Sequence, residues 1–223
     1  MNVLLLHGAL GCSTQLAPLR LALEEKEFTV YDLNFSGHGG EPFAREFGIE
    51  EFALEVRNFI VSNNLNDLIV FGYSMGGYIA LWLTHRYPVL LSKVVTLGTK
   101  FDWSPESAAR EISKMNAEKI EQKVPAFARI LQQRHAPNEW KELMQKTTDM
   151  MQGLGEKPLL SEEILSSIHI PITIALGDSD DMADRTYSER VTRLLPNARF
   201  VLLPETPHPI EKVRIEKIVE LII

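Results

Sequence analysis

Residues 68–77 read Leu68-Ile69-Val70-Phe71-Gly72-Tyr73-Ser74-Met75-Gly76-Gly77. The first half of this stretch is a continuous apolar run typical of a buried strand, and helix-forming residues follow its end. The Gly-x-Ser-x-Gly pattern between them predicts a sharp turn that lifts Ser74 above the edge of a sheet. Glycines are needed at such a turn because side chains there would collide with the neighbouring strand and helix. We therefore interpret Ser74 as a candidate nucleophile.

Short apolar runs that end at turn residues recur on both sides of this stretch. Besides 68–73, they cover residues 3–6, 29–33, 94–97, 172–176 and 199–203. Helical patterns lie between them, over residues 16–25, 50–61, 75–86 and 186–195. Strands that alternate with helices indicate crossover connections, so we expect an all-parallel sheet of six strands covered by helices on both faces.

Residues 99–170 break this alternation, because they contain helix signals and no convincing strand. Ser104 and the proline after it predict the start of a helix that carries Ile120 on its apolar face. A second helix lies around residues 127–131, a third follows Pro137 and stops at Gly153, and a short one leads to residue 171. We therefore expect one domain formed by residues 1–98 and 171–223, with a helical insertion at 99–170.

The composition is that of an ordinary globular chain, with 223 residues of which 45% are hydrophobic and 24% charged. The 30 acidic against 23 basic side chains argue against a nucleic-acid partner, which normally requires a basic patch. No apolar run approaches the roughly 18 residues of a membrane span, and no signal peptide is evident. Cys12 alone forms no internal disulfide. We expect a cytoplasmic protein without a membrane span.

A serine nucleophile requires a histidine as general base and a third group that orients this histidine. His208 lies directly beyond the last predicted strand, at the edge where a parallel sheet presents ligand-facing residues, and is the best candidate base. We interpret His85, His135 and His169 as surface or packing residues.

The acid is expected in the loop of residues 177–184, which follows the strand at 172–176. This loop offers four carboxylates, those of Asp178, Asp180, Asp181 and Asp184. A calcium site is the alternative interpretation, but the glycine and terminal glutamate of an EF-hand loop are missing, so we expect no metal. The chain order Ser, Asp, His is the order found on one of the folds that carry this triad.

Acyl transfer also requires backbone donors that point at the developing oxyanion. One is expected to be the N–H of Met75, the residue after the nucleophile. The second is expected from the loop of residues 7–11, whose glycines allow backbone amides to turn towards the site. We interpret His7 as a residue that braces this loop and not as a catalyst.

Three motifs together resemble the α/β-hydrolase superfamily. They are Leu4-Leu5-Leu6-His7-Gly8, the turn that runs from Asp32 to Gly37-His38-Gly39, and the Gly72 to Gly77 elbow. The resemblance implies a three-layer α/β-hydrolase fold with a mostly parallel sheet. It also places the family's Gly-x-x-Asp on Gly177 and Asp180, which favours Asp180 over Asp178 as the acid. Pro207 stands where the family usually has a glycine before the histidine.

By the same resemblance, residues 99–170 correspond to the cap, or lid, that roofs the serine. The cap would shape the substrate pocket. The candidates for its apolar lining are Phe101, Trp103, Trp140, Met144, Met150 and Met151. Packing between helices is the plainer interpretation of these residues.

The resemblance implies a serine hydrolase, of the carboxylesterase or thioesterase kind, that cleaves an ester or related acyl bond of a small, apolar substrate. Ser74 would attack, His208 would move the proton, Asp180 would hold His208, and the N–H groups of Ala9 and Met75 would stabilise the oxyanion. An acyl-enzyme would form, and no cofactor would be needed. A serine at this position disfavours the dehalogenase and epoxide-hydrolase branches, which carry aspartate there.

Two other functions stay open. The elbow is also similar to that of the menaquinone-pathway enzymes of the superfamily, which would make the protein a cofactor-free lyase or C–C bond hydrolase. A pair of arginines facing Ser74, drawn from Arg110, Arg129 and Arg134, would favour that alternative, although solvated surface charge is the plainer role of each. The third possibility is a non-catalytic protein that binds a ligand in the same cavity.

Overall fold

A six-stranded parallel sheet forms the centre of the computed structural model, which describes residues 1–223. The strands are β1 (Asn2–Leu6), β2 (Thr29–Asp32), β3 (Leu68–Tyr73), β4 (Leu91–Leu97), β5 (Ile172–Ser179) and β6 (Ala198–Pro207). They lie in the order β2-β1-β3-β4-β5-β6, and every neighbouring pair is parallel. The predicted number and direction of the strands are confirmed, and β5 and β6 run on beyond the predicted apolar runs.

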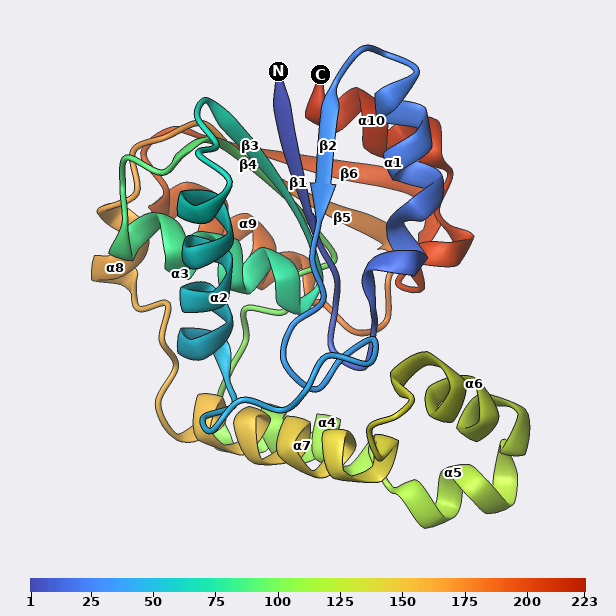
Figure 1. The fold of residues 1–223 in the computed structure, drawn as a ribbon. Helices are drawn as coiled ribbons and strands as arrows, with labels where there is room; N and C mark the ends of the chain where they lie inside the picture. The colour runs from blue at the N-terminus through green and yellow to red at the C-terminus, as the bar shows by residue number, and fades with distance from the viewer.

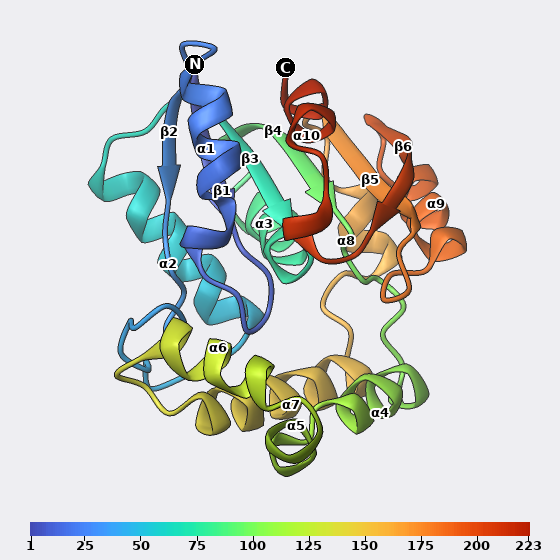
Figure 2. The same cartoon turned by 90° about the vertical axis from the view of Figure 1, so that its right-hand side faces the viewer.

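Helices cover both faces of the sheet (Figures 1 and 2). One face carries α1 (Ala17–Glu24) and α10 (Ile215–Ile222), and the other carries α2 (Ile49–Ser62), α3 (Met75–Arg86), α8 (Glu162–Ser166) and α9 (Arg185–Leu194). The inner strands β1, β3 and β5 are buried from both sides over most of their length, which explains their continuous apolar sequences.

Alternation along β1 shows how the two faces share the core. Val3 and Leu5 pack in the cluster that contains α1 and α10, whereas Leu4 and Leu6 pack in the larger cluster with α2 and α3. Successive side chains of a strand point to opposite faces, so four consecutive apolar residues serve both layers. Helix α10 was not among the predicted helices.

The strand order determines where ligands can bind. The chain passes from β1 to β2 on one side and then crosses to β3 on the other side of β1, so the connections diverge after β1 and β3. Open parallel sheets bind ligands at the carboxyl ends of the strands, at such a switch point. Leu6, which ends β1, is paired with Gly72 of β3 at this edge.

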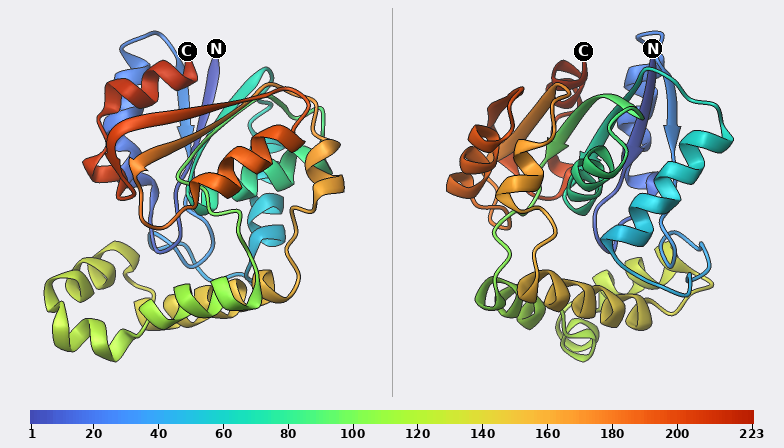
Figure 3. Two further views of the ribbon diagram at one scale, coloured as in Figure 1. Left: turned by 180° about the vertical axis from the view of Figure 1, so that it is seen from behind. Right: turned by 90° about the vertical axis from the view of Figure 1, so that its left-hand side faces the viewer.

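Four helices lie beyond this edge of the sheet: α4 (Pro105–Lys114), α5 (Ala117–Lys123), α6 (Pro125–His135) and α7 (Trp140–Glu156) (Figures 1 and 3). From here on, the cap means these four helices. Two details differ from the expectation. The side chain of Asn116 caps a separate helix α5, so Ile120 is not on α4. Helix α7 continues through Gly153, where an added Cβ would meet no atom of another segment within 4 Å.

The short helix α8 belongs to the core. The insertion expected from the sequence includes it, but α8 packs against α3 and α9, and Leu165 and Ile168 are buried in the larger core cluster. The cap also has a small cluster of its own, formed by Ala128, Leu131, Trp140 and Met144. The segment that stands apart from the three layers is therefore shorter than residues 99–170.

The two termini lie near each other at the edge of the sheet opposite the cap (Figures 1, 2 and 3). None of the helices combines the length and the apolar character that a membrane crossing needs. The cap lies over the carboxyl edge of the sheet, on the side away from the termini, and the candidate site residues lie between the cap and the sheet (Figures 1 and 2).

Candidate active site

Ser74 occupies a strained turn between β3 and α3. Its backbone has φ 52° and ψ −115°, in the left-handed range that residues with a side chain rarely adopt. Such a conformation costs about 1–3 kcal/mol and persists only where the surroundings impose it. Here the Ser74 N–H donates to the Leu97 carbonyl at 2.8 Å, and the Thr99 hydroxyl donates to the Ser74 carbonyl at 2.9 Å.

Two glycines allow this turn to form. A Cβ on Gly72 would lie 2.4 Å from the Gly77 nitrogen, and a Cβ on Gly76 would lie 2.4 Å from the Leu6 carbonyl oxygen. Both distances are far below van der Waals contact, so β3, α3 and β1 can approach only because these residues have no side chain. The glycines of the motif are therefore required by packing around Ser74.

His208 and Asp180 form a buried pair. His208 Nδ1 lies 2.8 Å from Asp180 Oδ2, and the side chains are 7% and 2% exposed. The other carboxylate oxygen, Oδ1, accepts the N–H groups of Met182 and Ala183 at 2.8 and 2.9 Å. Because Asp180 accepts the Nδ1 proton, Nε2 of the neutral ring is left to accept a proton from a nucleophile.

Two residues outside the predicted set support this pair. The Tyr73 hydroxyl donates to the His208 carbonyl at 3.0 Å, and burial raises the pKa of Tyr73, which keeps the hydroxyl protonated. Gly98 at the end of β4 has φ 63°, and a Cβ there would lie 2.9 Å from Asp180 Oδ2 and 3.2 Å from the His208 ring. The only sign of Gly98 in the sequence was its position directly after the apolar run of residues 94–97.

The other carboxylates of the acid loop have different surroundings. Asp178 is exposed and accepts the Thr206 N–H at 3.2 Å and the Ser179 hydroxyl at 2.9 Å. Hydrogen bonds from backbone N–H groups, that of Glu205 first, and from Ser179 hold the pKa of Asp178 below its ordinary value. Asp184 caps α9 through the Tyr187 N–H. No set of His, Cys, Asp and Glu side chains converges in a way that could hold a metal ion.

The predicted oxyanion loop, residues 7–11, lies against the serine. A Cβ on Gly8 would lie 3.2 Å from Ser74 Cβ, and the Gly11 N–H donates to the Gly8 carbonyl at 3.0 Å, which closes a tight turn. Leu10 within this turn has φ 55°. Met75 is the first residue of α3, where backbone N–H groups and the helix dipole favour a negative charge.

His7 links this loop to the segment after β2 by hydrogen bonds. It is buried, its Nδ1–H donates to the Gly8 carbonyl at 2.8 Å, and its Nε2 accepts the Phe35 N–H at 3.3 Å. Burial lowers the pKa of His7 to about 4, so the ring is neutral at ordinary pH. His38 and His135 are buried beside it, with ring centroids 5.1 Å apart for His7 and His38 and 5.8 Å apart for His38 and His135.

Ser74, His208 and the predicted oxyanion donors Ala9 and Met75 all line one cavity of about 390 Å³, which we call the site cavity. Most of its lining residues are apolar, and the cap and the core both contribute to them. Four of the six predicted pocket residues line the cavity: Trp103, Met144, Met150 and Met151. Phe101 and Trp140 do not line it. Phe101 packs against the core beside Tyr78, and Trp140 is buried in the cluster of the cap.

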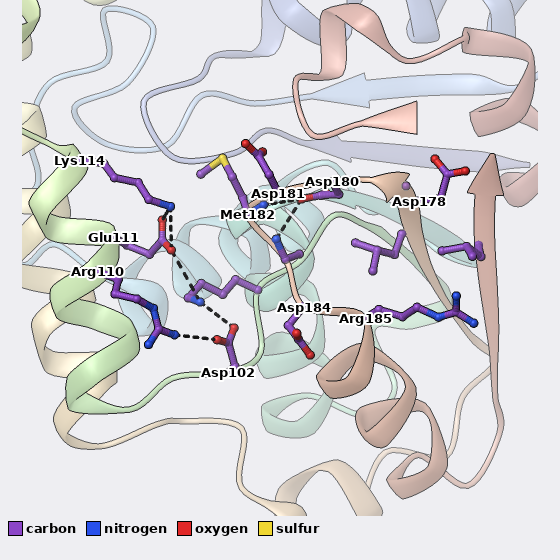
Figure 4. Close-up of a pocket in the computed structure, with 15 residues that line it drawn as sticks. Asp102, Arg110, Glu111, Lys114, Asp178, Asp180, Asp181, Met182, Asp184 and Arg185 are labelled. Atoms are coloured by element: carbon purple, nitrogen blue, oxygen red, sulfur yellow. Dashed lines mark hydrogen bonds and ion pairs between the residues drawn. The ribbon is translucent and has the colours of Figure 1, made fainter. Parts of the chain in front are cut away.

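A second pocket of about 420 Å³, drawn in Figure 4, shares charged lining residues with the site cavity. Lys100 and Asp102, on the link from β4 to α4, pair at 2.7 Å, and Glu111 of α4 lies 3.0 Å from Lys114 and 4.0 Å from Lys100. We call these four residues the α4 contact. Lys100, Glu111 and Lys114 line both spaces, and the sequence analysis did not identify them.

A family model described as "alpha/beta hydrolase fold" matches residues 2–158. The chain belongs to the α/β-hydrolase family. This confirms the family and the fold that the three sequence motifs predicted.

The curated relatives in this family are distant. "Serine hydrolase BPHL" of Homo sapiens is 24% identical over 222 residues, which cover 92% of this chain and 72% of that protein. A Saccharomyces cerevisiae protein named "Probable alcohol acetyltransferase" is 24% identical over 193 residues, and the match spans 85% of this chain but about half of that protein, 52%. Relatives in the family thus include proteins named for hydrolysis and for acyl transfer.

Solved structures share the fold over nearly the whole chain. A thermophilic esterase from Thermogutta terrifontis superposes with a TM-score of 0.76 and 21% identity, covering 99% of this chain and 87% of the esterase. An enol-lactonase from Burkholderia xenovorans LB400 has a TM-score of 0.77 at 17% identity, with 99% and 90% covered. At these identities the likeness concerns the fold.

Proposed function

We propose that this protein is a serine hydrolase that cleaves a carboxylic ester, or a related acyl bond such as a thioester, through an acyl-enzyme intermediate. One observation carries the proposal. The His208–Asp180 pair, held at 2.8 Å, lines the same side of the fold as Ser74, and Ser74 and His208 border one apolar cavity. Relatives named as esterases and hydrolases in the same family support it.

In the first half-reaction, the Ser74 hydroxyl oxygen attacks the carbonyl carbon while His208 Nε2 takes its proton. The carbonyl oxygen becomes an oxyanion and accepts hydrogen bonds from the N–H groups of Ala9 and Met75. His208 then gives the proton to the leaving alcohol or thiol as the carbon–oxygen or carbon–sulfur bond breaks. The result is an acyl group on Ser74 and a free first product.

In the second half-reaction, water attacks the acyl-enzyme and His208 takes one of its protons. Collapse of the new tetrahedral intermediate breaks the bond to Ser74 and returns this proton to the serine oxygen. Asp180 keeps the ring in the correct orientation and stabilises the imidazolium in both halves. The N–H groups of Met182 and Ala183, which donate to the Asp180 carboxylate, fix its orientation toward His208.

The cavity supports a small, largely apolar acyl or alcohol group as substrate. Its volume of about 390 Å³ and its methionine-rich lining suit flexible apolar chains. Among the three arginines considered for a carboxylate-rich substrate, only Arg134 lines this cavity. Since a facing pair is missing, ester hydrolysis is favoured over the menaquinone-type alternative.

The decisive experiment compares wild type with Ser74→Ala on short p-nitrophenyl esters and a fluorophosphonate probe. Wild type should turn over ester and become labelled, and Ser74→Ala should lose about 10⁴-fold or more in kcat and all labelling. A wild type that neither hydrolyses ester nor takes the label would reject the proposed function. Labelling of the variant would assign the nucleophile to another serine.

The acid is tested by a matched pair in one loop. Asp180→Asn should lower kcat by about 10³–10⁴-fold, because the amide no longer holds the ring in the required tautomer. Asp178→Asn should change kcat less than about threefold, since Asp178 faces solvent and binds Thr206. An undiminished rate for Asp180→Asn would reject the assignment.

A further inference from the structure

We propose that His135, at the end of cap helix α6, is a positioning residue that holds the oxyanion loop in its active conformation. The proposal rests on the function proposed above, since it concerns how the loop of residues 7–11 presents its N–H groups. His135 lies 125 residues from Leu10 in the sequence, yet its Nε2 is 3.0 Å from the Leu10 carbonyl oxygen. The cap thus reaches the backbone next to Ala9.

A second residue at the end of α6, Arg134, also contacts Leu10. The Arg134 guanidinium donates to the same carbonyl oxygen at 2.9 Å, so this one oxygen has two donors from the cap. Leu10 has φ 55°, a conformation that a leucine adopts only when its surroundings impose it. We call the interaction of Arg134 and His135 with Leu10 the α6 contact.

The ring of His135 is also held from the other side. Its Nδ1 accepts the Gly39 N–H at 3.1 Å, and the side chain is fully buried. A carbonyl only accepts and an N–H only donates, so these two partners require the neutral ring with its proton on Nε2. The imidazole therefore bridges the oxyanion loop and the turn of residues 37–41 in a single orientation.

The residues that follow α6 also contact the turn of residues 37–41. The Asn138 side chain donates to the Gly37 carbonyl at 3.3 Å and to the Glu41 carbonyl, and a Cβ on Gly40 would lie 2.8 Å from the Ala136 carbonyl oxygen. The end of α6 is therefore seated on a defined backbone surface. His135 is the member of this surface that touches the oxyanion loop.

Arg134 extends the contact to the loop that carries the base. Its guanidinium lies 3.7 Å from the carboxylate of Glu211, which also accepts a hydrogen bond from Gln15. Arg134, Glu211 and Gln15 all line the site cavity beside His208. One helix end thus contacts the oxyanion loop and, through Glu211, the segment after His208.

This arrangement makes oxyanion stabilisation depend on the seating of the cap. The Leu10 carbonyl shares its peptide plane with the Gly11 N–H, which donates to the Gly8 carbonyl at 3.0 Å. The Gly8 carbonyl in turn shares its peptide plane with the Ala9 N–H. Holding the Leu10 carbonyl therefore restricts the Ala9 N–H through this hydrogen bond. A displacement of about 1 Å in such a group costs on the order of 10²-fold in rate. Displacement of the Ala9 N–H should therefore weaken stabilisation of the oxyanion in the transition state and leave the binding of a neutral ligand unchanged.

The test replaces His135 by alanine, asparagine and glutamine. Glutamine can place an amide N–H near the position of Nε2 and so reach Leu10, whereas asparagine reaches only towards Gly39. We expect His135→Ala and His135→Asn to lower kcat on a p-nitrophenyl ester about 10- to 100-fold with KM within about twofold. His135→Gln should recover most of this loss. Two variants serve as controls. One is His85→Gln, since the His85 ring forms its hydrogen bond with the Ser167 hydroxyl, and the other is Arg129→Gln, since Arg129 is exposed on α6. Both should have the wild-type rate.

A pair of inhibitors separates positioning from folding. An alkyl trifluoromethyl ketone takes up the Ser74 oxygen at its carbonyl carbon, passes the serine proton to His208 and turns its own oxygen into an oxyanion. The methyl ketone of the same chain binds without this addition. The proposal is supported if the variants with reduced kcat bind the trifluoromethyl ketone more weakly than wild type does and bind the methyl ketone as tightly as wild type. Equal weakening of both ketones, loss in KM, or a glutamine variant as impaired as alanine overturns it.

Failure of the underlying function gives a different result. If wild type shows neither ester turnover nor fluorophosphonate labelling, the hydrolase proposal fails before any His135 variant is measured. If wild type is active and all three His135 variants match it in kcat and inhibitor affinity, the hydrolase proposal stands and the role of His135 is rejected.

Discussion

Two contacts between the cap and the rest of the chain border the site cavity, and they differ in chemistry. The α6 contact consists of hydrogen bonds from Arg134 and the neutral ring of His135 to one backbone carbonyl, that of Leu10. The α4 contact is a chain of alternating charges from Lys114 to Asp102 (Figure 4). The first joins segments far apart in the sequence, and the second joins a helix to the link that precedes it.

The difference indicates a division of tasks. A buried imidazole with a donor partner and an acceptor partner has one favourable geometry, so the α6 contact suits a part of the site that must stay fixed. Ion pairs tolerate changes in distance because the Coulomb energy varies slowly, so the α4 contact suits a wall that adapts to its ligand. The predictions below test this contrast.

Acid should weaken the α6 contact first. Burial lowers the pKa of both His7 and His135 to about 4, from an ordinary 6.5, so the unfolded chain takes up protons at higher pH than the folded one. The stability from the neutral rings is complete above about pH 6.5 and is lost as pH falls towards 4. It amounts to on the order of 3 kcal/mol per ring at most.

Urea unfolding of wild type and His135→Gln at about pH 7 and about pH 4.5 checks this expectation. The glutamine variant should lose less unfolding free energy than wild type between the two pH values, because it has one fewer group to protonate. An identical loss in the two proteins would show that His135 does not contribute to the pH dependence.

Removing one charge should disrupt the α4 contact by an intermediate amount. Glu111 is only 10% exposed at its side chain and lies between Lys100 and Lys114, so Glu111→Gln leaves two ammonium groups without this partner. We expect the unfolding free energy to fall by about 2 kcal/mol. The control is Glu142→Gln in the exposed pair with Lys146, which should cost no more than about 0.5 kcal/mol. Equal costs would remove the distinction between a buried and a surface contact.

Salt should produce the smallest effect and should act mainly on the α4 contact. Arg110, which is 66% exposed, lies 3.9 Å from Asp102 and is open to screening. Raising sodium chloride from about 0.05 M to about 0.5 M should speed amide hydrogen exchange in α4 by a few-fold and in α6 by less, since α6 has the hydrogen bonds to Leu10 besides its one ion pair, Arg134–Glu211. Exchange that speeds up in α6 as much as in α4 would contradict the contrast between the two contacts.

The core was predictable because its patterns are local. A strand buried on both faces must be apolar at every position, and β3 therefore matches residues 68–73 as predicted from the sequence. The elbow was predictable because close approach at Gly72 and Gly76 admits no side chain. Helix α10 was missed although Ile215, Ile218, Val219 and Ile222 follow helical spacing, so the signal was present.

The cap was less predictable because several arrangements satisfy the same helical pattern. Trp140 and Met144 lie one turn apart on α7, yet Met144 lines the site cavity and Trp140 does not. Which of them faces the cavity depends on where α6 packs against α7. His135 was expected to be a surface or packing residue, and it is a buried packing residue. Arg134 was expected to carry solvated charge, whereas its side chain is 16% exposed and donates to the Leu10 carbonyl.

By itself, the sequence determined the parallel sheet, the family, the turn at Ser74 and the loops that carry Asp180 and His208, because strand burial and tight turns constrain residues that are neighbours in the chain. Only the tertiary structure decided that Arg134 and His135 hold Leu10, that the α4 contact walls the cavity and that Gly98 lies against the Asp180–His208 pair. These contacts join residues distant in sequence. Their partners are determined by how whole helices pack, and no local pattern records that packing.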